Sequence, residues 1–426
     1  MIENKYKSSF YNIYKSRNEE KEIFNSFTKA NVIFTDTMFN SIKENRIEDI
    51  DVETIKELLK LGIIVPNNID EFETIKENYI KYRNAKDTLL ITLIPTFMCN
   101  FRCPYCFEGT DAKANQTIIN YNVLKKYAHL NFPEYKHVHI TLFGGEPLLC
   151  YNKTLDFFKY LKSEFENSDH TYSSSIATNA YILNKDKIVN LIETCNCKTF
   201  QITIDGCKRT HNMLRHLANG QSTYDEVLSN FKTLLKYNEN NKLNIVLRVN
   251  LFNNTLNEVD DFLNEFSDEE KSKFLIYFRY IYNTNEFKKE NKNQIDLKRF
   301  YEKARSKGYL INYNKSFSFY HCEGDGAEEQ LHILPDLSVY KCVNDMSYEE
   351  SCVGNIDSNG EIVFNNNLYN WNDYSFFEDD KCSNCKYLPM CWGGCPLIFK
   401  KTGKRVCIHE KNMEEIEQKK GEGINA

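Results

Sequence analysis

Three cysteines lie close together in the segment Cys99-Asn-Phe-Arg-Cys-Pro-Tyr-Cys106. Three thiolates in this C-x3-C-x2-C pattern can hold three corners of a 4Fe–4S cube and leave its fourth iron without a protein ligand. Such an open iron can bind and activate a small molecule, whereas a cluster with four cysteines is normally an electron carrier. A structural zinc site is disfavoured because the segment offers no fourth Cys or His, and a chance group of loop cysteines is the remaining alternative.

A second group of cysteines lies toward the C-terminus and contains the pattern C-x2-C-x5-C-x3-C. Its members are Cys382, Cys385, Cys391, Cys395 and Cys407, and Cys322 and Cys342 precede them. Pairs of the form C-x2-C serve both zinc and iron–sulfur clusters, so a zinc ribbon is the alternative. Seven cysteines do not divide into closed zinc sites, which favours clusters.

The composition limits where such thiols can work. The chain has 426 residues and 15 cysteines, and the odd number excludes a fully paired set of intrachain disulfides. The N-terminal residues lack the apolar segment of a signal peptide, and apolar runs such as 89–94 are too short to cross a bilayer. We therefore expect a cytoplasmic protein with reduced, metal-binding cysteines and no membrane partner. The net charge of −6 gives no cationic field for nucleic acid.

The residues around the first cysteine group predict how it is positioned. Residues 89–95 have the pattern of a buried strand ended by Pro95, so the three cysteines follow a strand directly. Further strands are expected in the segments 137–147, 173–180, 201–206, 244–251 and 274–281. In a β/α barrel, the loops at the carboxyl ends of the strands build the active site.

The cysteine triad after a first strand, with the aromatic Tyr105 before Cys106, resembles the radical S-adenosylmethionine (SAM) superfamily. The motifs Gly144-Gly-Glu-Pro147 and Gln201-Ile-Thr-Ile-Asp-Gly206 follow in the order that the family shows. The resemblance implies an α/β fold with a partial (β/α)6 barrel. It also implies that the SAM-binding 4Fe–4S cluster is held by Cys99, Cys103 and Cys106.

The resemblance further implies which residues contact SAM. The backbone at Gly144 and Gly145 could approach a ligand closely, and with Glu146 it would bind the SAM amine. The SAM carboxylate would meet the hydroxyl of Thr203 and the guanidinium of Arg215, which can give a carboxylate two parallel hydrogen bonds. A solvated helix position is the alternative for Arg215.

Three more residues complete the expected cofactor-binding set: Tyr105, Thr178 and Arg248. Thr178 begins the segment Thr178-Asn-Ala180, which resembles the family's T-N-G with Ala180 in place of glycine. Arg248 shares one side of its strand with Asn250, so both are expected to face the pocket, with ordinary barrel packing as the alternative.

The second cysteine group resembles the SPASM extension of the same superfamily. The resemblance implies two auxiliary 4Fe–4S clusters, one held by Cys382, Cys385, Cys391 and Cys407 and the other by Cys322, Cys342 and Cys395. The family's glycine before Cys342 is replaced by Leu337, although Pro335-Asp336 still predicts a turn. The fourth ligand of the second cluster is either Cys352 or an open site for a substrate thiolate. The other cysteines, Cys150, Cys195, Cys197 and Cys207, are expected to be buried small hydrophobes.

Three segments are expected: a winged-helix-like module at 1–85, the barrel at 86–300 and the cluster domain at 301–426. The module should contain helices at 52–59 and 72–82 and short strands near 9–14, 24–28 and 62–66. In related peptide-modifying enzymes a similar module adds a leader peptide as a strand on an exposed edge. A cap that only covers the barrel is the alternative, and acidic residues in the module disfavour DNA binding.

The resemblance implies that the first cluster reduces SAM to methionine and a 5′-deoxyadenosyl radical, which abstracts hydrogen from a substrate. We expect a ribosomally made precursor peptide with a leader segment, and a thioether between a Cys sulfur and a carbon of another residue. The auxiliary clusters would accept an electron, and flavodoxin or ferredoxin would donate one. Open-iron cubes are oxygen-labile, so we expect an anaerobic enzyme. No side chain is predicted as a catalytic proton acceptor.

The alternative function is that of an anaerobic sulfatase-maturing enzyme, which forms formylglycine. That group has its triad near the chain start and an Asp directly after the cysteine that matches Cys342. This chain has Val343 there, with Asp345 two residues further on. A maturase that forms carbon–carbon cross-links or a cofactor is another alternative. A non-catalytic leader-binding protein is disfavoured because the triad and Gly144–Pro147 are complete.

Overall fold

The computed structural model describes residues 5–17, 20–84, 87–106, 108, 117–238, 242–251, 258–281, 297–311, 329–346, 348–372, 375–405 and 407. The chain divides into two compact units. Unit 1 comprises Met1–Ala85, Phe319–Ala327 and Tyr369–Ala426, and unit 2 comprises Lys86–Ser318 and Glu328–Leu368. The expected cluster ligand Cys322 lies outside the described residues.

Unit 2 is built on a parallel β-sheet, which confirms the predicted α/β class. Its strands lie side by side in the order β12-β11-β10-β9-β8-β7-β6-β13, and every neighbouring pair among them is parallel. They are β6 (Thr88–Leu93), β7 (His137–Leu142), β8 (Thr171–Thr178), β9 (Cys197–Thr203), β10 (Asn244–Leu251), β11 (Leu275–Tyr280), β12 (Leu310–Ile311) and β13 (Gln330–Ile333). The six strands predicted from the sequence correspond to β6–β11. Beyond β13, the antiparallel strands β14 (Ser338–Tyr340), β15 (Gly354–Ile356) and β16 (Ile362–Phe364) extend the sheet.

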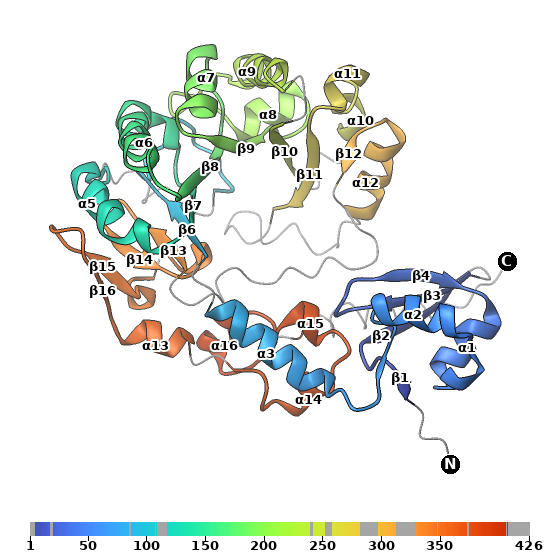
Figure 1. The fold of residues 1–426 in the computed structure, drawn as a ribbon. Helices are drawn as coiled ribbons and strands as arrows, with labels where there is room; N and C mark the ends of the chain where they lie inside the picture. Colours follow the sequence, from blue (N-terminus) through green and yellow to red (C-terminus); the bar gives the residue numbers. More distant parts are fainter. Residues whose placement is uncertain are drawn as a thin grey trace. The chain divides into compact units, whose positions relative to one another are not determined.

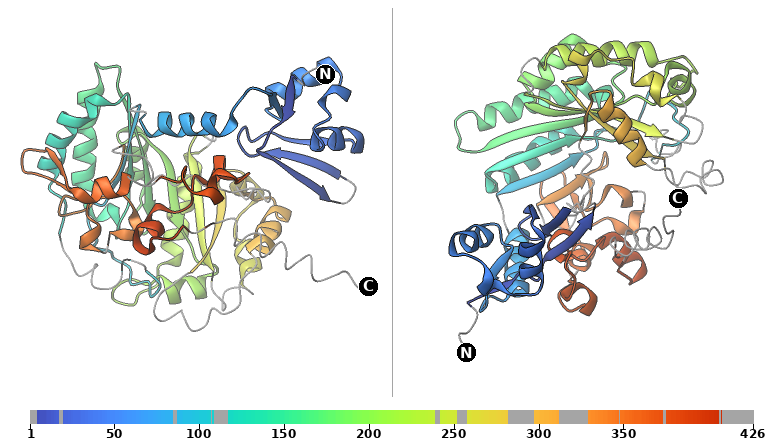
Figure 2. Two further views of the ribbon diagram at one scale, coloured as in Figure 1. Left: turned by 90° about the horizontal axis from the view of Figure 1, so that it is seen from below. Right: turned by 90° about the vertical axis from the view of Figure 1, so that its right-hand side faces the viewer.

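Helices connect the parallel strands, as a parallel sheet requires, because its strands cannot be joined by tight hairpins. They are α5 (Tyr121–Asn131), α6 (Tyr151–Phe165), α7 (Lys185–Glu193), α8 (Lys208–Leu214), α9 (Tyr224–Lys236), α10 (Val259–Phe262), α11 (Asp268–Lys271) and α12 (Leu297–Ser306). Figure 1 shows α5, α6, α7 and α9 along the outer face of a curved sheet, and Figure 2 shows the strands of this sheet side by side.

Alternation along β6 and β7 explains why one face of the sheet is covered. Leu89, Ile91 and Leu93 of β6 are at most 3% exposed and share a core with Val138 and Ile140 of β7. Each such side chain contributes about 1.5–3 kcal/mol when it is fully buried. The residues between them, mostly Thr and His, lie on the opposite face. The concave face of the sheet is therefore unusually polar.

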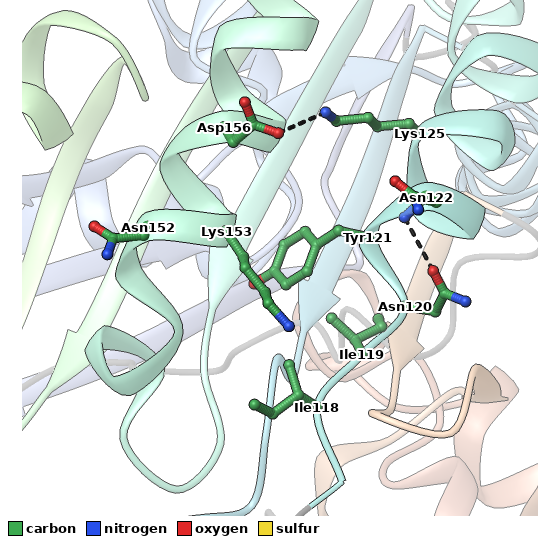
Figure 3. Close-up of a pocket in the computed structure, with 9 residues that line it drawn as sticks. All are labelled: Ile118, Ile119, Asn120, Tyr121, Asn122, Lys125, Asn152, Lys153 and Asp156. Carbon is green, nitrogen blue, oxygen red and sulfur yellow. Dashed lines mark hydrogen bonds and ion pairs between the residues drawn. The ribbon is translucent and has the colours of Figure 1, made fainter.

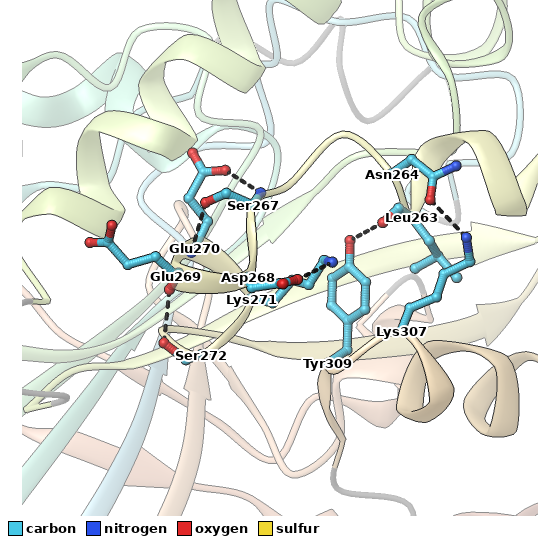
Figure 4. A network of polar contacts seen from close by, with 10 residues as sticks. All are labelled: Leu263, Asn264, Ser267, Asp268, Glu269, Glu270, Lys271, Ser272, Lys307 and Tyr309. Carbon is cyan, nitrogen blue, oxygen red and sulfur yellow. Dashed lines mark hydrogen bonds and ion pairs between the residues drawn. The ribbon is translucent and has the colours of Figure 1, made fainter.

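Polar contacts fix the segments that lead into β11 and β12 (Figure 4). Ser267 caps α11 through a capping box: its hydroxyl accepts from the amide of Glu270 at 3.2 Å, and the Glu270 carboxylate accepts from the amide of Ser267 at 2.8 Å. The Tyr309 hydroxyl donates to the carbonyl of Leu263 at 2.8 Å and anchors the start of β12. These contacts hold the amino ends of β11 and β12 in place.

Unit 1 contains a three-stranded antiparallel sheet, a separate strand pair and short helices. Its elements are β1 (Tyr6–Ser8), β2 (Asn12–Arg17), β3 (Glu20–Asn25), β4 (Asn31–Phe34), α1 (Asp36–Lys43), α2 (Val52–Lys60), β5 (Ile64–Pro66), α3 (Glu71–Arg83), α14 (Asp380–Ser383), α15 (Leu388–Cys391) and α16 (Pro396–Thr402). The strand order is β2-β3-β4, and β1 pairs with β5. The predicted helices at 52–59 and 72–82 correspond to α2 and α3.

Helix α3 joins the two ends of the chain in one hydrophobic core. Tyr79 packs its ring against Phe376 and Trp392, with centroids 4.8 Å apart in both pairs. The hydroxyl of Ser26 donates to the carbonyl of Lys386, whose ammonium donates to the carbonyl of Asn12 at 3.1 Å. The C-terminal cysteine-rich segment is thus part of the same unit as the N-terminal module. Within the described part of the chain, no helix has the length and apolar character needed to cross a membrane.

Candidate functional site

A cavity of about 510 Å³ lies at the carboxyl ends of β7–β11 and at the cysteine loop that follows β6. Its size is typical of a small-molecule site. The expected site residues on its wall are Cys99, Cys103, Tyr105, Cys106, Gly144, Gly145, Thr178, Thr203, Arg215 and Arg248. Asn250 also lines it. The structure therefore brings to one cavity the residues that the sequence placed on different loops and strands, apart from Glu146.

The cysteine loop is tied to the rest of unit 2 by backbone contacts. Phe101 forms a bridge with Leu217, and the amide of Arg102 donates to the carbonyl of His216 at 3.0 Å. The Arg102 guanidinium donates to the carbonyl of Cys99 at 2.6 Å. These bonds hold the loop in place while its half-buried thiols stay on the cavity wall.

The donor set on this loop fits an iron–sulfur cube better than a single ion. Within the described ranges, no three His, Cys, Asp or Glu side chains gather closely enough to hold one metal ion. A cube takes each thiolate on a different iron corner, so its ligands need not converge on one point. Three thiols on one cavity wall, with no fourth from the loop, match an open-iron cluster.

Gly144 and Gly145 are required by the close approach of the cysteine loop. A Cβ at Gly145 would lie 2.2 Å from the carbonyl oxygen of Met98, and one at Gly144 would lie 2.9 Å from that of Thr96. Gly144 also has φ of +112°, which side chains rarely adopt. The amide of Glu146 donates to the Met98 carbonyl at 2.8 Å. These glycines therefore let the two loops pack, in addition to any approach to a ligand.

Glu146 lies behind the cavity wall. Its side chain is fully buried and accepts from the hydroxyl of Thr178 at 2.7 Å and from the amides of Asn179 and Leu148 at 2.8 and 3.0 Å. Burial raises the pKa of this carboxyl, and the three donors oppose the rise. The carboxylate thus ties the end of β8 to the loop after β7. The wall itself carries the glycine backbone.

The segment after β8 keeps the shape of a glycine turn without a glycine. Ala180 has φ of +60°, in the left-handed region that favours glycine. The side-chain amide of Asn179 donates to the Asn100 side chain at 2.7 Å, inside the cysteine loop. The Thr178-Asn-Ala180 turn therefore gives the cysteine loop a second anchor, in addition to its packing on Gly145.

A buried polar network borders the cavity at Tyr105, Arg215 and Asn250. Tyr105 donates its hydroxyl to the carboxylate of Asp205 and accepts from the guanidinium Nη1 of Arg215 at 2.8 Å. Asp205 also accepts from the backbone and side-chain amides of Asn250 at 3.0 and 3.1 Å. Burial raises the pKa of Tyr105 well above 10.0, with Arg215 opposing and Asp205 adding to the rise. The phenol therefore stays protonated and donates.

Asp205 is not among the site residues predicted from the sequence. The signal was present, because Asp205 lies in the Gln201–Gly206 motif at the end of β9 and a buried carboxylate needs donors. Arg248 donates its Nε to the Asn250 side chain at 2.9 Å, and both residues line the cavity.

This network does not use every guanidinium donor on the cavity wall. The buried Nε of Arg215 has no acceptor among the described residues. Arg215 and Arg248 both line the cavity, and both interact electrostatically with the buried Asp205 carboxylate. A buried, unpaired donor is costly unless a ligand completes it. The part of the cavity lined by Arg215 and Arg248 is therefore suited to a carboxylate.

Four of the C-terminal cysteines lie near one another in unit 1. Burial raises the pKa of Cys382 to about 12, and Cys391 and Cys385 add to the rise. Burial likewise raises the pKa of Cys391 to about 11, with contributions from Cys407 and Cys385. These pairwise effects indicate that the four thiols lie close together. They are the four residues that the SPASM resemblance assigns to one auxiliary cluster.

Leu337 keeps the turn that the resemblance places before Cys342. It has φ of +70°, so the left-handed conformation persists although the residue is not glycine. The amide of Leu337 donates to the carbonyl of Leu334 at 2.9 Å in the connection from β13 to β14. Cys342 follows β14, and Cys352 precedes β15, its antiparallel neighbour. The Cys352 thiol donates to the carbonyl of Gly354 at 3.1 Å.

The cysteines outside the motifs are mostly core residues. Cys150, Cys195 and Cys197 are at most 4% exposed, and Cys207 is half-buried. Burial raises the pKa of Cys197 to about 12, with smaller opposing contributions from its hydrogen bonds. Such thiols stay protonated at neutral pH, as the sequence predicted for buried small hydrophobes.

A second cavity, of about 590 Å³, opens at the starts of α5 and α6 (Figure 3). Lys125 and Asp156 form an ion pair of 2.7 Å on its rim, and Asn120 caps α5. It contains none of the expected site residues.

Residues 93–266 match the family model described as Radical SAM superfamily. The radical SAM cyclopropyl synthase TigE of Paramaledivibacter caminithermalis is 24% identical over 428 residues, which cover 91% of this chain and 84% of that protein. A cysteine-type anaerobic sulfatase-maturating enzyme of Clostridium novyi is 27% identical over 332 residues, 70% of this chain and 84% of that one. The structure of Streptococcus suis SuiB bound to precursor peptide SuiA is 14% identical with a TM-score of 0.53, and covers 93% of this chain and 97% of that chain. This last likeness shows the fold.

Proposed function

Because residues 93–266 place this chain among the radical SAM superfamily enzymes, we propose that it is a peptide maturase that binds SAM on a 4Fe–4S cluster held by Cys99, Cys103 and Cys106. The observation that carries the proposal is the cavity that these three thiols share with Thr203 and Arg215. Bound together, the reduced cluster and SAM supply one-electron chemistry that removes a hydrogen atom from the substrate.

The chain's own residues would hold SAM by its two charged groups. Arg215 and Thr203 would bind the carboxylate, since the buried Nε of Arg215 lacks a protein acceptor. The backbone at Gly144 and Gly145 would bind the amine, because the Glu146 carboxylate is occupied behind them. Tyr105 would keep Arg215 oriented through its 2.8 Å hydrogen bond. Thr178 and Arg248 complete the wall and help to exclude water.

The proposed substrate is a ribosomally made precursor peptide. SuiB, which shares the fold, was solved with a precursor peptide, and TigE is a further radical SAM relative that matches 91% of this chain. In unit 1, β4 is at the edge of its sheet, and Ile33 on it is 63% exposed. A free strand edge of this kind can accept a leader segment as an added strand.

The proposed bond is a thioether between a Cys sulfur and a carbon of another residue. Its formation is an oxidation, and the auxiliary clusters proposed at the C-terminal cysteines would take the electron. A carbon–carbon bond is the second candidate, because a cyclopropyl group, in the name of TigE, is closed by one. A flavodoxin or ferredoxin is the proposed source of the first electron.

Formylglycine formation is less well supported, although the Clostridium novyi sulfatase-maturating enzyme is a relative. In the sulfatase-maturing group an Asp follows the cysteine that matches Cys342. Val343 lines the cavity at that position and has no group that accepts a proton. Asp345 is 2% exposed and is not part of the cavity wall.

The test of the proposal is SAM cleavage by anaerobically reconstituted protein with dithionite. We expect 5′-deoxyadenosine from the natural sequence and none from the variant with Cys99, Cys103 and Cys106 all changed to Ala. The matched control is Cys207→Ala, a half-buried cysteine outside the motifs, which should keep the activity. Retained cleavage in the triple variant would refute the assignment.

A further inference from the structure

The concave face of the sheet carries a row of polar side chains on β7 and β8. Alternation places His137, His139 and Thr141 of β7 on this face, because Val138, Ile140 and Leu142 are buried on the other. The parallel register sets Ser173 beside His139 and Ser175 beside Thr141. The proposed function above gives these residues no role.

These side chains form one unbroken chain of hydrogen bonds. Its links, in order, are Thr141 to Ser175 at 2.8 Å, Ser175 to His139 Nε2 at 3.0 Å, His139 Nδ1 to Ser173 at 2.8 Å, Ser173 to His137 Nε2 at 2.8 Å, and His137 Nδ1 to Thr171 at 2.8 Å. Both nitrogens of each imidazole are used. A neutral imidazole donates from one nitrogen and accepts at the other, so it can pass a proton through its ring.

One bond at the end of the chain gives every other bond a direction. The hydroxyl of Thr171 donates to the carbonyl of Lys136 at 3.4 Å, so it accepts from His137 Nδ1. His137 then accepts at Nε2 from Ser173, which in turn accepts from His139 Nδ1. By the same rule His139 accepts at Nε2 from Ser175. All the hydrogens therefore point from Thr141 toward Thr171.

The two ends of this chain of hydrogen bonds lie at different places on the sheet. Thr171 is exposed at the start of β8. Thr141 and Ser175 lie two residues before Phe143 and Ala177, which line the cavity that holds the cysteine triad. Two residues of strand span about 7 Å, which one or two water molecules can bridge. The chain thus runs from beneath the cavity to the solvent at the opposite edge.

We propose that Thr141, Ser175, His139, Ser173, His137 and Thr171 form a proton relay that carries a proton from the cavity to solvent. The purpose of the relay rests on the proposed function. Joining a Cys sulfur to a carbon removes two hydrogens from the peptide. One leaves as a hydrogen atom. The other leaves as an electron, which an iron–sulfur cluster accepts, and as a proton, which the proton relay accepts.

The lowered pKa values of the two histidines favour transfer of a proton over its stable binding to either ring. Burial lowers the pKa of His139, and the neighbouring His137 lowers it further. Burial also lowers the pKa of His137. Neither ring therefore traps a proton near neutral pH. A row of hydroxyls alone would lack groups that can accept and release a proton at this pH.

The test is the exchange of histidine ring protons with solvent, measured by NMR on the full chain with ¹⁵N-labelled histidine. The chain has only nine histidines, so the spectrum is simple. Both His137 and His139 should be neutral with the proton on Nδ1. Ser173→Ala should slow exchange of the His139 ring proton by about tenfold or more, because that proton then has no route through His137. Ser173→Thr, which keeps the hydroxyl, should exchange at the natural rate.

Thr141→Val is the matched control, since it removes the inner end of the chain and leaves the outward route from His139 intact. Equal exchange in Ser173→Ala and Ser173→Thr, or a proton on Nε2 of either ring, would overturn the relay. Formation of 5′-deoxyadenosine is measured separately on the same variants. If the natural protein formed no 5′-deoxyadenosine, the proposed function would be refuted, and the result of the proton-exchange measurement would be unaffected.

Discussion

The guanidinium Nη1 of Arg215 lies 2.8 Å from the phenolic oxygen of Tyr105 and donates to it. Tyr105 immediately precedes Cys106, so the arginine is held by a residue next to a predicted cluster ligand. The Nε of the same guanidinium is buried and has no acceptor among the described residues. Its remaining hydrogen-bonding capacity is directed to whatever occupies the cavity.

Arg215→Lys should therefore weaken SAM binding by roughly 10- to 100-fold, because hydrogen bonds to a charged group contribute about 1.5–3 kcal/mol. Calorimetric titration of SAM into reconstituted protein measures the change. Arg209→Ala is the control, since Arg209 lies on α8, the helix that Arg215 directly follows, and its side chain is 91% exposed. Equal affinities for the Arg215→Lys variant and the natural sequence would contradict the assignment.

The two glycine positions near the site should respond differently to a methyl group. A Cβ at Gly145 overlaps the Met98 carbonyl, so Gly145→Ala must displace the cysteine loop and lower iron incorporation. Gly206 has φ of +71°, but its Cβ would meet nothing closer than 3.9 Å. Gly206→Ala should cost about 1 kcal/mol of stability and leave iron content unchanged. Iron assays with thermal melts test both, and normal iron in Gly145→Ala would refute the argument.

Iron and sulfide should exceed one cluster per chain after reconstitution. Three clusters would give about twelve of each, and Cys391→Ala should remove about four. The same change at Cys207, outside the motifs, should remove none. A value near four for the natural sequence would show that the C-terminal cysteines do not bind clusters.

Buried histidines predict a loss of stability in mild acid. Burial, with Lys341 nearby, lowers the pKa of His332 from 6.5 to about 4. The unfolded chain then binds the proton first, so stability is complete above pH 6.5 and falls as the pH decreases toward 4. Linkage gives a loss of about 1.4 kcal/mol from this group between about pH 7.5 and 5.5. Urea unfolding of the metal-free chain at both pH values measures it.

His332→Gln should remove this part of the pH dependence. His129→Gln should leave it intact, because the His129 side chain is 68% exposed. An unchanged pH dependence in the His332 variant would show that the ring has the same pKa in the folded and unfolded chains, which would contradict this prediction.

The sequence predicted the strands of unit 2 well because their patterns are local. Segments such as 244–251 alternate strongly, and β10 spans those residues. β13 was missed because its burial is set by pairing with β6, far away in the sequence. Near 24–28 the prediction was partly wrong: β3 ends at Asn25, whose side chain accepts from the amides of Phe27 and Thr28 and closes a turn.

In the site, the residues themselves were easier to predict from the sequence than their hydrogen-bond partners. The motifs identified Glu146, but only the fold shows that its carboxylate is occupied by donors from β8 and the loop after β7. Asp205 was not predicted because its hydrogen-bond donors, Tyr105 and Asn250, lie on other segments that are far away in the sequence. Long-range pairing of buried polar groups is not encoded in any local pattern.

The packing of α3 against Phe376 and Trp392 also constrains the order in which the two units can fold during synthesis. Tyr79 leaves the ribosome about 300 residues before these partners. At about 5–20 residues per second this is a delay of roughly 15–60 seconds, in which all of unit 2 can fold. Unit 1 is completed last, when the cysteine-rich segment emerges. Newly made chains truncated before residue 376 should therefore expose the apolar face of α3 and depend on chaperones during that interval.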